Sequence, residues 1–168
     1  MASRVRVLIA EPLDDVGLAR LRAEPGFVVD VVDASRRGDL QVALKDADAL
    51  VVRSQTKVTA ELIAAAPRLK MIGRAGAGID NIDVPAATRR GIVVVNVPTG
   101  NTISAAEHTW ALILAMARHI PDAHVSLGAG QWERERFQGT ELAGKTLGLL
   151  GFGRVGREVA RRALAFGM

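Results

Sequence analysis

Short apolar runs alternate with amphipathic stretches along residues 4–98 of the chain. The runs are continuous rather than interrupted by polar residues, which is typical of parallel strands buried on both faces. They predict strands at 4–10, 27–33, 48–54, 69–76 and 92–98. The amphipathic stretches between them predict helices at 13–24, 38–47, 59–67 and 83–91.

This regular alternation of strand and helix favours an α/β fold. Because crossovers between parallel strands are right-handed, the pattern predicts a flavodoxin-like, doubly wound parallel sheet with helices covering both faces. Local signals agree with the pattern. Thr59 is a predicted N-cap and Pro67 a predicted stop for the third helix.

The pattern changes after Pro98. Residues 101–120 predict one long helix, in which Ser104 and Glu107 have the spacing of a capping box. The stretch 110–116 is apolar on every side, so it should be buried on every side. A small domain offers few such positions, and we therefore expect a homodimer with an interface through residues 104–140.

The end of the chain predicts the beginning of a second βαβ unit. Residues 122–142 are polar and rich in turn formers, with Trp132 and Phe137 as expected anchors. A strand at 145–151 and a helix at 153–166 follow, and Gly167 suits the end of that helix. The expected division is a first domain at 1–98 and, at 99–168, the first and incomplete part of a Rossmann nucleotide-binding domain.

Composition narrows the functional classes. In 168 residues, 49% are apolar, which is enough for a sizeable core. The net charge of +4 is modest and aromatic residues make up 4%, so we expect no nucleic-acid partner. No apolar run reaches the ~20 residues of a membrane span, and none forms the core of a signal peptide. The absence of cysteine fits a cytoplasmic protein.

The strongest chemical motif is Gly151-x-Gly153-x-x-Gly156, between the predicted strand and helix. The first glycine permits a tight turn, the second permits close approach of a pyrophosphate, and the third lets the helix pack closely. The helix N-terminus adds free N–H groups and a positive dipole. The acidic residue that separates NAD from NADP is expected about 20 residues further on, beyond Met168.

A rival motif lies at 139–146, where Gly-x-x-x-x-Gly-Lys-Thr matches a P-loop. A P-loop follows a strand and opens a helix. Here charged residues precede the motif and a predicted strand follows it. The pattern therefore disfavours a P-loop phosphotransferase and favours a turn that leaves Lys145 in solvent.

Several polar or small residues fall at the ends of predicted strands. Arg53 and Ser54 follow one strand, at the edge where open α/β sheets bind ligands. Gly76-Ala77-Gly78 follows another strand and could bind an anion through backbone N–H groups. From these residues alone, Arg53 could equally be an ordinary surface arginine, and the segment 76–78 could equally be a tight turn. Asn96 and Asn101 flank the expected domain boundary, and Asn101 could simply cap a helix.

The histidines suggest no catalytic or metal site. None of His108, His119 and His124 has metal-ligand spacing with a second histidine or a carboxylate. The sequence shows no convincing Ser-His-Asp set. We therefore nominate no catalytic residue in this chain and expect no bound metal.

Taken together, four motifs resemble the D-2-hydroxyacid dehydrogenase family. They are Arg-Ser-x-Thr at 53–56, Gly-Arg-Ala-Gly-x-Gly-x-Asp-Asn at 73–81, Gly-Asn-x-x-Ser-Ala-Ala-Glu at 100–107 and Gly-Thr-Glu-Leu-x-Gly-Lys-Thr at 139–146. Within that family they are most similar to the members that oxidise 3-phosphoglycerate in serine synthesis. The resemblance implies an NAD-dependent oxidoreductase.

The resemblance also implies roles for single residues. Residues Arg53, Ser54, Gly76, Ala77, Gly78 and Asn101 would contact the substrate. Residues Ala77, Gly151, Gly153, Arg154, Val155 and Gly156 would contact the cofactor. The catalytic His–Glu pair and the carboxylate-binding Arg of the family would lie beyond Met168. We therefore expect an N-terminal fragment that is inactive alone. The alternatives are a non-enzymatic NAD-binding module, like the corepressors of the same superfamily, or another D-2-hydroxyacid dehydrogenase.

Overall fold

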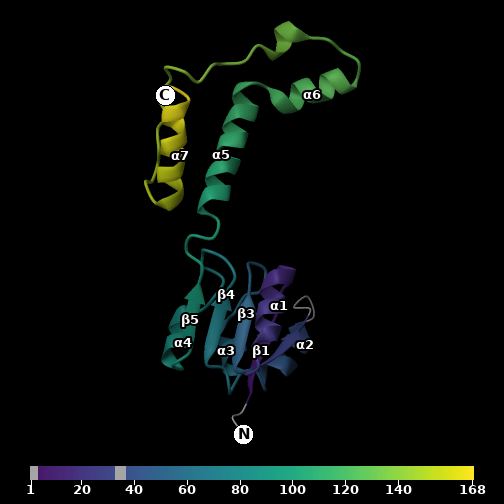
Figure 1. Ribbon diagram of the computed structural model, residues 1–168, viewed down its shortest axis with the longest axis vertical. Coiled ribbons are helices and arrows are strands. Elements are labelled where there is room, and N and C mark those ends of the chain that lie inside the picture. The colour runs from purple at the N-terminus through teal and green to yellow at the C-terminus, as the bar shows by residue number, and fades with distance from the viewer. Residues whose placement is uncertain (1–3, 33–36) are drawn as a thin grey trace. The chain divides into compact units, whose positions relative to one another are not determined.

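The computed structural model of the protein describes residues 4–32 and 37–168 (Figure 1). The chain divides into two compact units, Met1–Pro98 and Thr99–Met168. The first unit contains all the strands in the described residues, and the second consists of helices and connecting segments.

The first unit is built on a five-stranded parallel sheet. The strands lie in the order β2-β1-β3-β4-β5, which is the flavodoxin-like order. The strands are β1 (Val5–Ile9), β2 (Phe27–Val31), β3 (Ala49–Val52), β4 (Met71–Arg74) and β5 (Val93–Asn96). The predicted fold class and all five predicted strands of this unit are confirmed.

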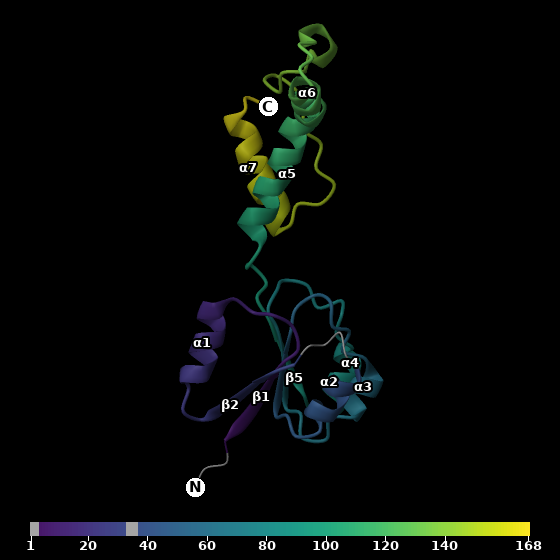
Figure 2. The ribbon, with the colours of Figure 1, turned by 90° about the vertical axis from the view of Figure 1, so that its right-hand side faces the viewer.

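Four helices connect the strands and lie on opposite faces of the sheet. They are α1 (Asp15–Ala23), α2 (Arg37–Leu44), α3 (Ala60–Ala64) and α4 (Val84–Arg89). Figure 2 shows α1 on one face and the other three helices on the opposite face. The main core fills the space under α2, α3 and α4, where Leu44, Leu50, Ile63 and Ile72 are fully buried.

Helices lie on both faces of the sheet, as predicted, but one face is covered only in part. On the α1 face, Met71, Val93 and Val95 on β4 and β5 remain exposed. The reason is geometric, because a helix about 10 Å wide covers roughly two strands spaced about 4.8 Å apart. Beside α1 an apolar pocket of about 340 Å³ opens, with Leu21, Phe27 and Met71 in its lining.

The N-cap predicted at the third helix is confirmed. The Thr59 Oγ1 atom accepts a hydrogen bond of 3.3 Å from the Leu62 N–H, which starts α3. The helix ends at Ala64, before Pro67. Such caps contribute about 1 kcal/mol each to helix stability.

The second unit contains α5 (Thr102–Ala117), α6 (Ile120–Gly128), a short 3-10 helix η1 (Arg134–Phe137) and α7 (Arg154–Ala165). Helices α5 and α7 lie side by side (Figures 1 and 2). Trp110 on α5 contacts α7 in two ways. Its indole N–H donates to the Val159 carbonyl oxygen at 3.1 Å, and its ring stacks on that of Phe166 with 4.6 Å between the ring centroids. Gly167, with φ +71°, ends α7 as predicted.

The long helix predicted at 101–120 is in fact two helices. His119 takes a left-handed backbone conformation, with φ 52°, and separates α5 from α6. Helix α6 then occupies residues predicted to be turn-rich. Pro121 lies in its first turn, where a missing N–H leaves no intrahelical bond unmade.

The predicted capping box at Ser104 and Glu107 is wrong. Helix α5 begins earlier, with Asn101 at the N-cap position. Ser104 lies inside the first turn and its hydroxyl donates to the Asn101 carbonyl oxygen at 3.2 Å. Glu107 instead faces Arg162 of α7, with an N–O distance of 3.8 Å.

The strand predicted at 145–151 does not form, and these residues have no regular secondary structure. A parallel strand needs a neighbouring strand to satisfy its backbone hydrogen bonds. The described unit Thr99–Met168 contains no strand that could pair with it. Apolar sequence alone therefore did not produce a strand here.

The unit itself buries only part of the helix that was expected to be buried on every side, with a subunit interface covering the rest, and that interface stays a prediction. Trp110 faces α7 and is buried, whereas Leu112 and Met116 are 57% and 74% exposed. Of the two expected anchors, Phe137 is half-buried, whereas Trp132 is 73% exposed and has the Arg134 guanidinium 5.9 Å from its ring centroid. The second unit therefore carries a surface of uncovered apolar side chains.

Candidate functional site

The carboxyl ends of β3, β4 and β5 meet at one edge of the sheet and bring together most of the site residues predicted in the first unit. Arg53 and Ser54 directly follow β3, the Gly76–Gly78 segment follows β4, and Asn96 ends β5. Parallel strands in register place these ends side by side. The edge is thus the candidate site of this unit.

Arg53 is exposed beside the loop that leads from β1 into α1. Its Nη1 atom donates to the Pro12 carbonyl oxygen at 3.3 Å. The side chain lines a pocket of about 600 Å³ together with Pro12, Leu13 and Asp14. Since one carbonyl is the only protein acceptor described for this guanidinium in residues 4–32 and 37–168, most of its donors remain available to an anion.

The segment after β4 presents backbone donors. The N–H groups of Ala77 and Gly78 donate to no protein acceptor in the part of the chain that the structure describes. The Asn96 side-chain amide holds the segment by donating to the Ala77 carbonyl oxygen at 2.6 Å. Free N–H groups held in this way suit a carboxylate or phosphate.

The Arg74 side chain lies against Gly76. A Cβ atom at Gly76 would lie 2.8 Å from the Arg74 Nη1 atom. The Arg74 side chain therefore lies over this segment and adds a second guanidinium to the edge. Positive charge and free N–H groups together make the edge suitable for an anionic ligand.

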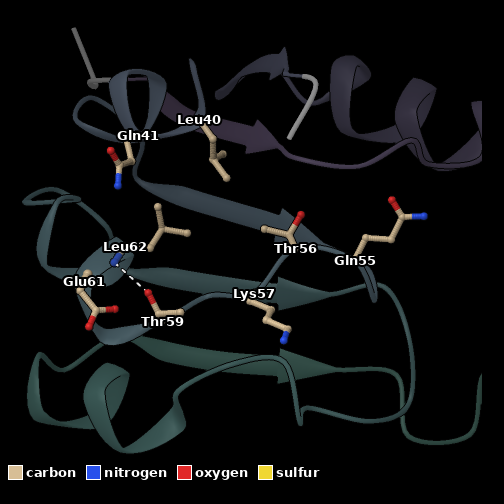
Figure 3. Close-up of a pocket in the computed structure, with 8 residues that line it drawn as sticks. All are labelled: Leu40, Gln41, Gln55, Thr56, Lys57, Thr59, Glu61 and Leu62. Carbon is tan, nitrogen blue, oxygen red and sulfur yellow. Dashed lines mark hydrogen bonds between the residues drawn. The ribbon is translucent and has the colours of Figure 1, made fainter. Parts of the chain in front are cut away.

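A separate pocket of about 470 Å³ lies between α2 and α3, on the other side of the loop after β3 (Figure 3). Leu40 and Leu62 face each other across it, and the polar ends of Gln55 and Lys57 point away from Leu62. The lining also holds one cation, Lys57, and one carboxylate, Glu61, so it carries no net positive charge. We do not place an anion there.

In the second unit, the turn at 151–156 is open to solvent. Gly151, Phe152 and Gly153 are exposed, and Gly151 has φ +98°, a conformation that favours glycine. Gly153 is the N-cap of α7 and supplies no side-chain cap. The first turn of a helix then offers N–H groups to an anion.

The three glycines of this turn are required for different reasons. Gly151 needs a positive φ, and a Cβ atom at Gly156 would lie 2.7 Å from the Gly151 carbonyl oxygen. A Cβ atom at Gly153 would meet nothing within 4 Å. The fold of the described residues therefore does not require glycine at 153, whereas a pyrophosphate approaching the backbone there would. These residues fit a dinucleotide cofactor.

Asn101, the remaining predicted substrate contact, belongs to the second unit. It occupies the N-cap position of α5 and its side chain makes no capping hydrogen bond. The side-chain amide is therefore not used by the helix. Its proposed contact with substrate stays a prediction, as do the contacts predicted for the other site residues.

The P-loop interpretation of 139–146 fails on structural grounds. No helix begins directly after Lys145, since the next helix, α7, starts at Arg154. The two glycines are needed by the fold itself, because a Cβ atom at Gly139 would lie 2.5 Å from the Ala117 carbonyl oxygen and Gly144 has φ +71°. Gly139 thus allows close packing and Gly144 allows a turn.

Among residues 4–32 and 37–168, no cluster of His, Cys, Asp and Glu is placed to hold a metal ion. None of the histidines forms an ion pair in this part of the chain. No helix in the same residues is long and apolar enough to cross a bilayer.

Sequence reasoning missed three residues at the sheet edge, namely Glu11, Arg74 and Asn81. Glu11 and Asn81 bond to the backbone that carries Arg53 and Ser54. The available signal for Glu11 was its position, because it is an acidic residue just after an apolar strand. Polar residues there lie at the ligand-binding edge of a parallel sheet.

Comparisons with known proteins agree with this geometry. The chain is 54% identical, over 98% of its length, to the D-3-phosphoglycerate dehydrogenase of Archaeoglobus fulgidus and spans 31% of that protein. It superposes with a TM-score of 0.89 on the TT0316 protein of Thermus thermophilus, at 37% identity, covering 98% of this chain and 54% of that one. The NAD-dependent formate dehydrogenase of Staphylococcus aureus, solved in complex with NAD, gives a TM-score of 0.83 at 30% identity. The match covers 96% of this chain and 53% of that one.

The chain thus spans about a third of the length of the curated relatives it matches. A family model describes the catalytic domain of the D-isomer specific 2-hydroxyacid dehydrogenases, and it matches residues 7–164. The match runs through both units and includes every predicted site residue. The chain therefore belongs to the D-isomer specific 2-hydroxyacid dehydrogenase family.

Proposed function

We propose that this chain is part of an enzyme that oxidises 3-phosphoglycerate to 3-phosphohydroxypyruvate with NAD, the first step of L-serine biosynthesis. The observation that carries the proposal is the anion-binding edge of the sheet, where Arg53 and the free N–H groups of Ala77 and Gly78 lie. The substrate carries a phosphate and a carboxylate, and both are anions. The similarity to D-3-phosphoglycerate dehydrogenases supports this substrate over other hydroxy acids.

In this proposal residues 1–98 form the substrate-binding domain. The Arg53 guanidinium and the Ser54 hydroxyl bind one anionic group of the substrate. The backbone of residues 76–78 binds the other anionic group, and Ala77 also approaches the nicotinamide ring. Asn101 contacts the substrate from the start of α5.

Residues 99–168 form the start of the NAD-binding domain in this proposal. The backbone at Gly151, Gly153, Arg154, Val155 and Gly156 holds the pyrophosphate at the N-terminus of α7. When bound, NAD accepts the hydride that leaves the C2 carbon of the hydroxy acid. The structure of a formate dehydrogenase relative with NAD supports NAD as the cofactor.

The proposal gives no acid–base role to the residues described here. General acid–base catalysis is worth roughly 10²–10⁴-fold in rate, and it requires a positioned proton donor or acceptor. No histidine in the described residues is paired with a carboxylate. We therefore expect the 168-residue chain to turn nothing over by itself.

We also propose a homodimer through residues 104–140 and a cytoplasmic location. The exposed apolar side chains of α5 and α6 support the dimer, among them Leu112, Met116, Val125 and Leu127. Exposed apolar surface, where it is contiguous, marks protein–protein contacts. The absence of cysteine supports the location.

The test is an assay of the full-length gene product for NADH formation from 3-phosphoglycerate. We expect activity, and we expect Arg53→Ala to raise the KM for 3-phosphoglycerate by about tenfold or more, since it removes a charge-assisted contact. Arg20→Ala, on the exposed last turn of α1, is the matched control. Cofactor binding without turnover of any hydroxy acid would favour the non-enzymatic module, and turnover of a different hydroxy acid would replace the substrate.

A further inference from the structure

The loop that follows β3 is held by a buried carboxylate from another strand end. Glu11, just after β1, is only 5% exposed. Its Oε1 atom accepts from the backbone N–H groups of Arg53 and Thr56, both at 2.9 Å. Its Oε2 atom accepts from the Gln55 N–H at 3.1 Å. The carboxylate thus binds the backbone on both sides of Ser54.

The carbonyl groups of the same loop are held from the opposite side. The Asn81 side-chain amide donates to the carbonyl oxygens of Arg53, at 2.9 Å, and Thr56, at 2.8 Å. Arg74 adds a bond of 3.2 Å from its Nε atom to the Arg53 carbonyl oxygen. Residues 53–56 are therefore fixed through both donors and acceptors of their main chain.

The charge of Glu11 is compensated without an arginine side chain. A buried carboxylate usually takes a cationic partner, because burial disfavours its charged form. Here burial tends to raise the pKa of Glu11, but the N–H donors of Thr56, Gln55 and Arg53 outweigh it and hold the pKa below its ordinary value. Glu11 is therefore ionised at neutral pH.

The side chain of Arg53 takes no part in this compensation. Its guanidinium contacts the Pro12 carbonyl oxygen, and in the described residues it forms no ion pair. An ion pair with Glu11 would have neutralised the charge that an anionic ligand needs. The loop therefore keeps two charges apart. The buried Glu11 carboxylate is hydrogen-bonded by backbone N–H groups, and the Arg53 guanidinium stays exposed.

We propose that Glu11 is a positioning residue, which fixes the backbone of residues 53–56 so that the Arg53 and Ser54 side chains face an anionic group of the substrate. Glu11 itself does not touch the substrate. The inference rests on the proposed function, because it takes Arg53 and Ser54 as substrate contacts. It adds that their placement depends on a carboxylate from the end of β1.

The kinetic test compares Glu11→Gln, Glu11→Asp and the exposed control Glu24→Gln in the full-length enzyme. We expect Glu11→Gln to raise the KM for 3-phosphoglycerate about tenfold, because one charge-assisted acceptor becomes an amide that cannot bind all three N–H groups. The KM for NAD should stay unchanged. Glu11→Asp, which keeps the charge, should recover part of the loss. Unchanged KM for 3-phosphoglycerate in Glu11→Gln, or an equal rise in both KM values, would overturn the proposal.

A second measurement separates this inference from the proposed function. Amide hydrogen exchange in the 168-residue chain measures directly how well the backbone N–H groups of the loop 53–56 are protected. In Glu11→Gln the amides of Arg53, Gln55 and Thr56 should exchange about tenfold faster or more, while those of β1 and β4 keep their protection. If Arg53→Ala leaves the KM unchanged but exchange follows Glu11, the substrate role of Arg53 is wrong and the loop contact stands. Unchanged exchange at the three amides contradicts the contact itself. Should Glu11→Gln not fold, the unaltered chain is titrated with acid and followed by NMR. The amide chemical shifts of Arg53, Gln55 and Thr56 should then change together, with one shared midpoint, and separate midpoints would contradict the contact.

Discussion

The carbonyl oxygen of Gly151 lies 2.7 Å from the position that a Cβ atom at Gly156 would occupy. The turn before α7 therefore closes back on the first turn of that helix, and only a residue without a side chain fits there. Since the obstacle is backbone, it cannot move aside as a flexible side chain would.

This relationship predicts that Gly156→Ala destabilises the protein. The added methyl group forces a backbone shift, which costs about 1–3 kcal/mol in the free energy of unfolding. Gly153→Ala is the matched comparison, because the same methyl group meets nothing within 4 Å. Urea unfolding should give a change below about 1 kcal/mol for that variant.

The same pair of variants separates folding from cofactor binding. In the full-length protein, Gly153→Ala should weaken NAD binding while leaving the unfolding midpoint nearly unchanged, since its methyl group would stand where the pyrophosphate approaches. Calorimetric titration with NAD measures this. An undiminished affinity in a folded Gly153→Ala variant would place the pyrophosphate elsewhere.

A second prediction concerns the contact between α5 and α7. Trp110→Phe keeps an aromatic ring for Phe166 but loses the hydrogen bond to the Val159 carbonyl oxygen. The expected cost is about 1–2 kcal/mol, from the lost bond and the smaller ring. Trp110→Ala should cost about 3–5 kcal/mol, because it also leaves a cavity. Thermal unfolding followed by circular dichroism measures both, and equal costs would show that the ring contributes little.

Asp48 provides a prediction about pH. Its carboxylate lies at the amino end of β3, far along the strand from the candidate site, and is buried. It accepts from the Arg6 N–H at 3.0 Å and pairs with Arg68 at 3.4 Å. The hydrogen bond from the Arg6 N–H holds the pKa of Asp48 below its ordinary value. Burial opposes this shift, and the charges of Arg68 and Lys70 add to it.

Because the folded pKa is depressed, the stabilisation by Asp48 is complete above the unfolded pKa of about 3.9. It is lost as the pH falls through the lower folded pKa. Asp48→Asn should therefore reduce the free energy of unfolding by about 1–3 kcal/mol at pH 7, and the difference should shrink below about pH 3.9. Asp46→Asn is the control, since among the described residues Asp46 forms only an exposed pair with Arg6, and its loss should change stability by less than about 1 kcal/mol.

The sequence predicted the first unit well because local and long-range requirements agree there. The strand runs are apolar, the helices between them have clear signals such as the Thr59 cap, and each strand finds its neighbours within the same unit. The failures lie where a segment's partner decides its structure. Residues 145–151 contain an apolar run, as the strands do, but have no strand beside them in the described unit.

The contacts of the candidate site were only partly predictable for a related reason. Glycine occurs where the backbone conformation or a close approach excludes a side chain. The turn at 151–156 could therefore be recognised from the spacing of its three glycines. The loop at 53–56 depends on Glu11 and Asn81, which are distant in sequence and bond to its main-chain atoms. The position of Glu11 after an apolar strand marks it as a residue of the ligand-binding edge, but no sequence pattern shows which backbone groups it will bond, and only the fold brings these residues together.

The last prediction tests the proposed homodimer through residues 104–140. Leu112 and Met116 lie on α5 away from Trp110 and are exposed in the single chain, although apolar residues of their size are usually buried. A charged side chain at the centre of a subunit interface leaves an unpaired charge in a desolvated place, which costs several kcal/mol in association. Leu112→Asp with Met116→Asp should therefore convert a dimer into a monomer in sedimentation velocity at micromolar concentration. Val16→Asp replaces an equally exposed apolar residue on α1 and should leave the sedimentation coefficient unchanged. A monomer before any substitution, or a dimer that survives the double substitution, would contradict this interface.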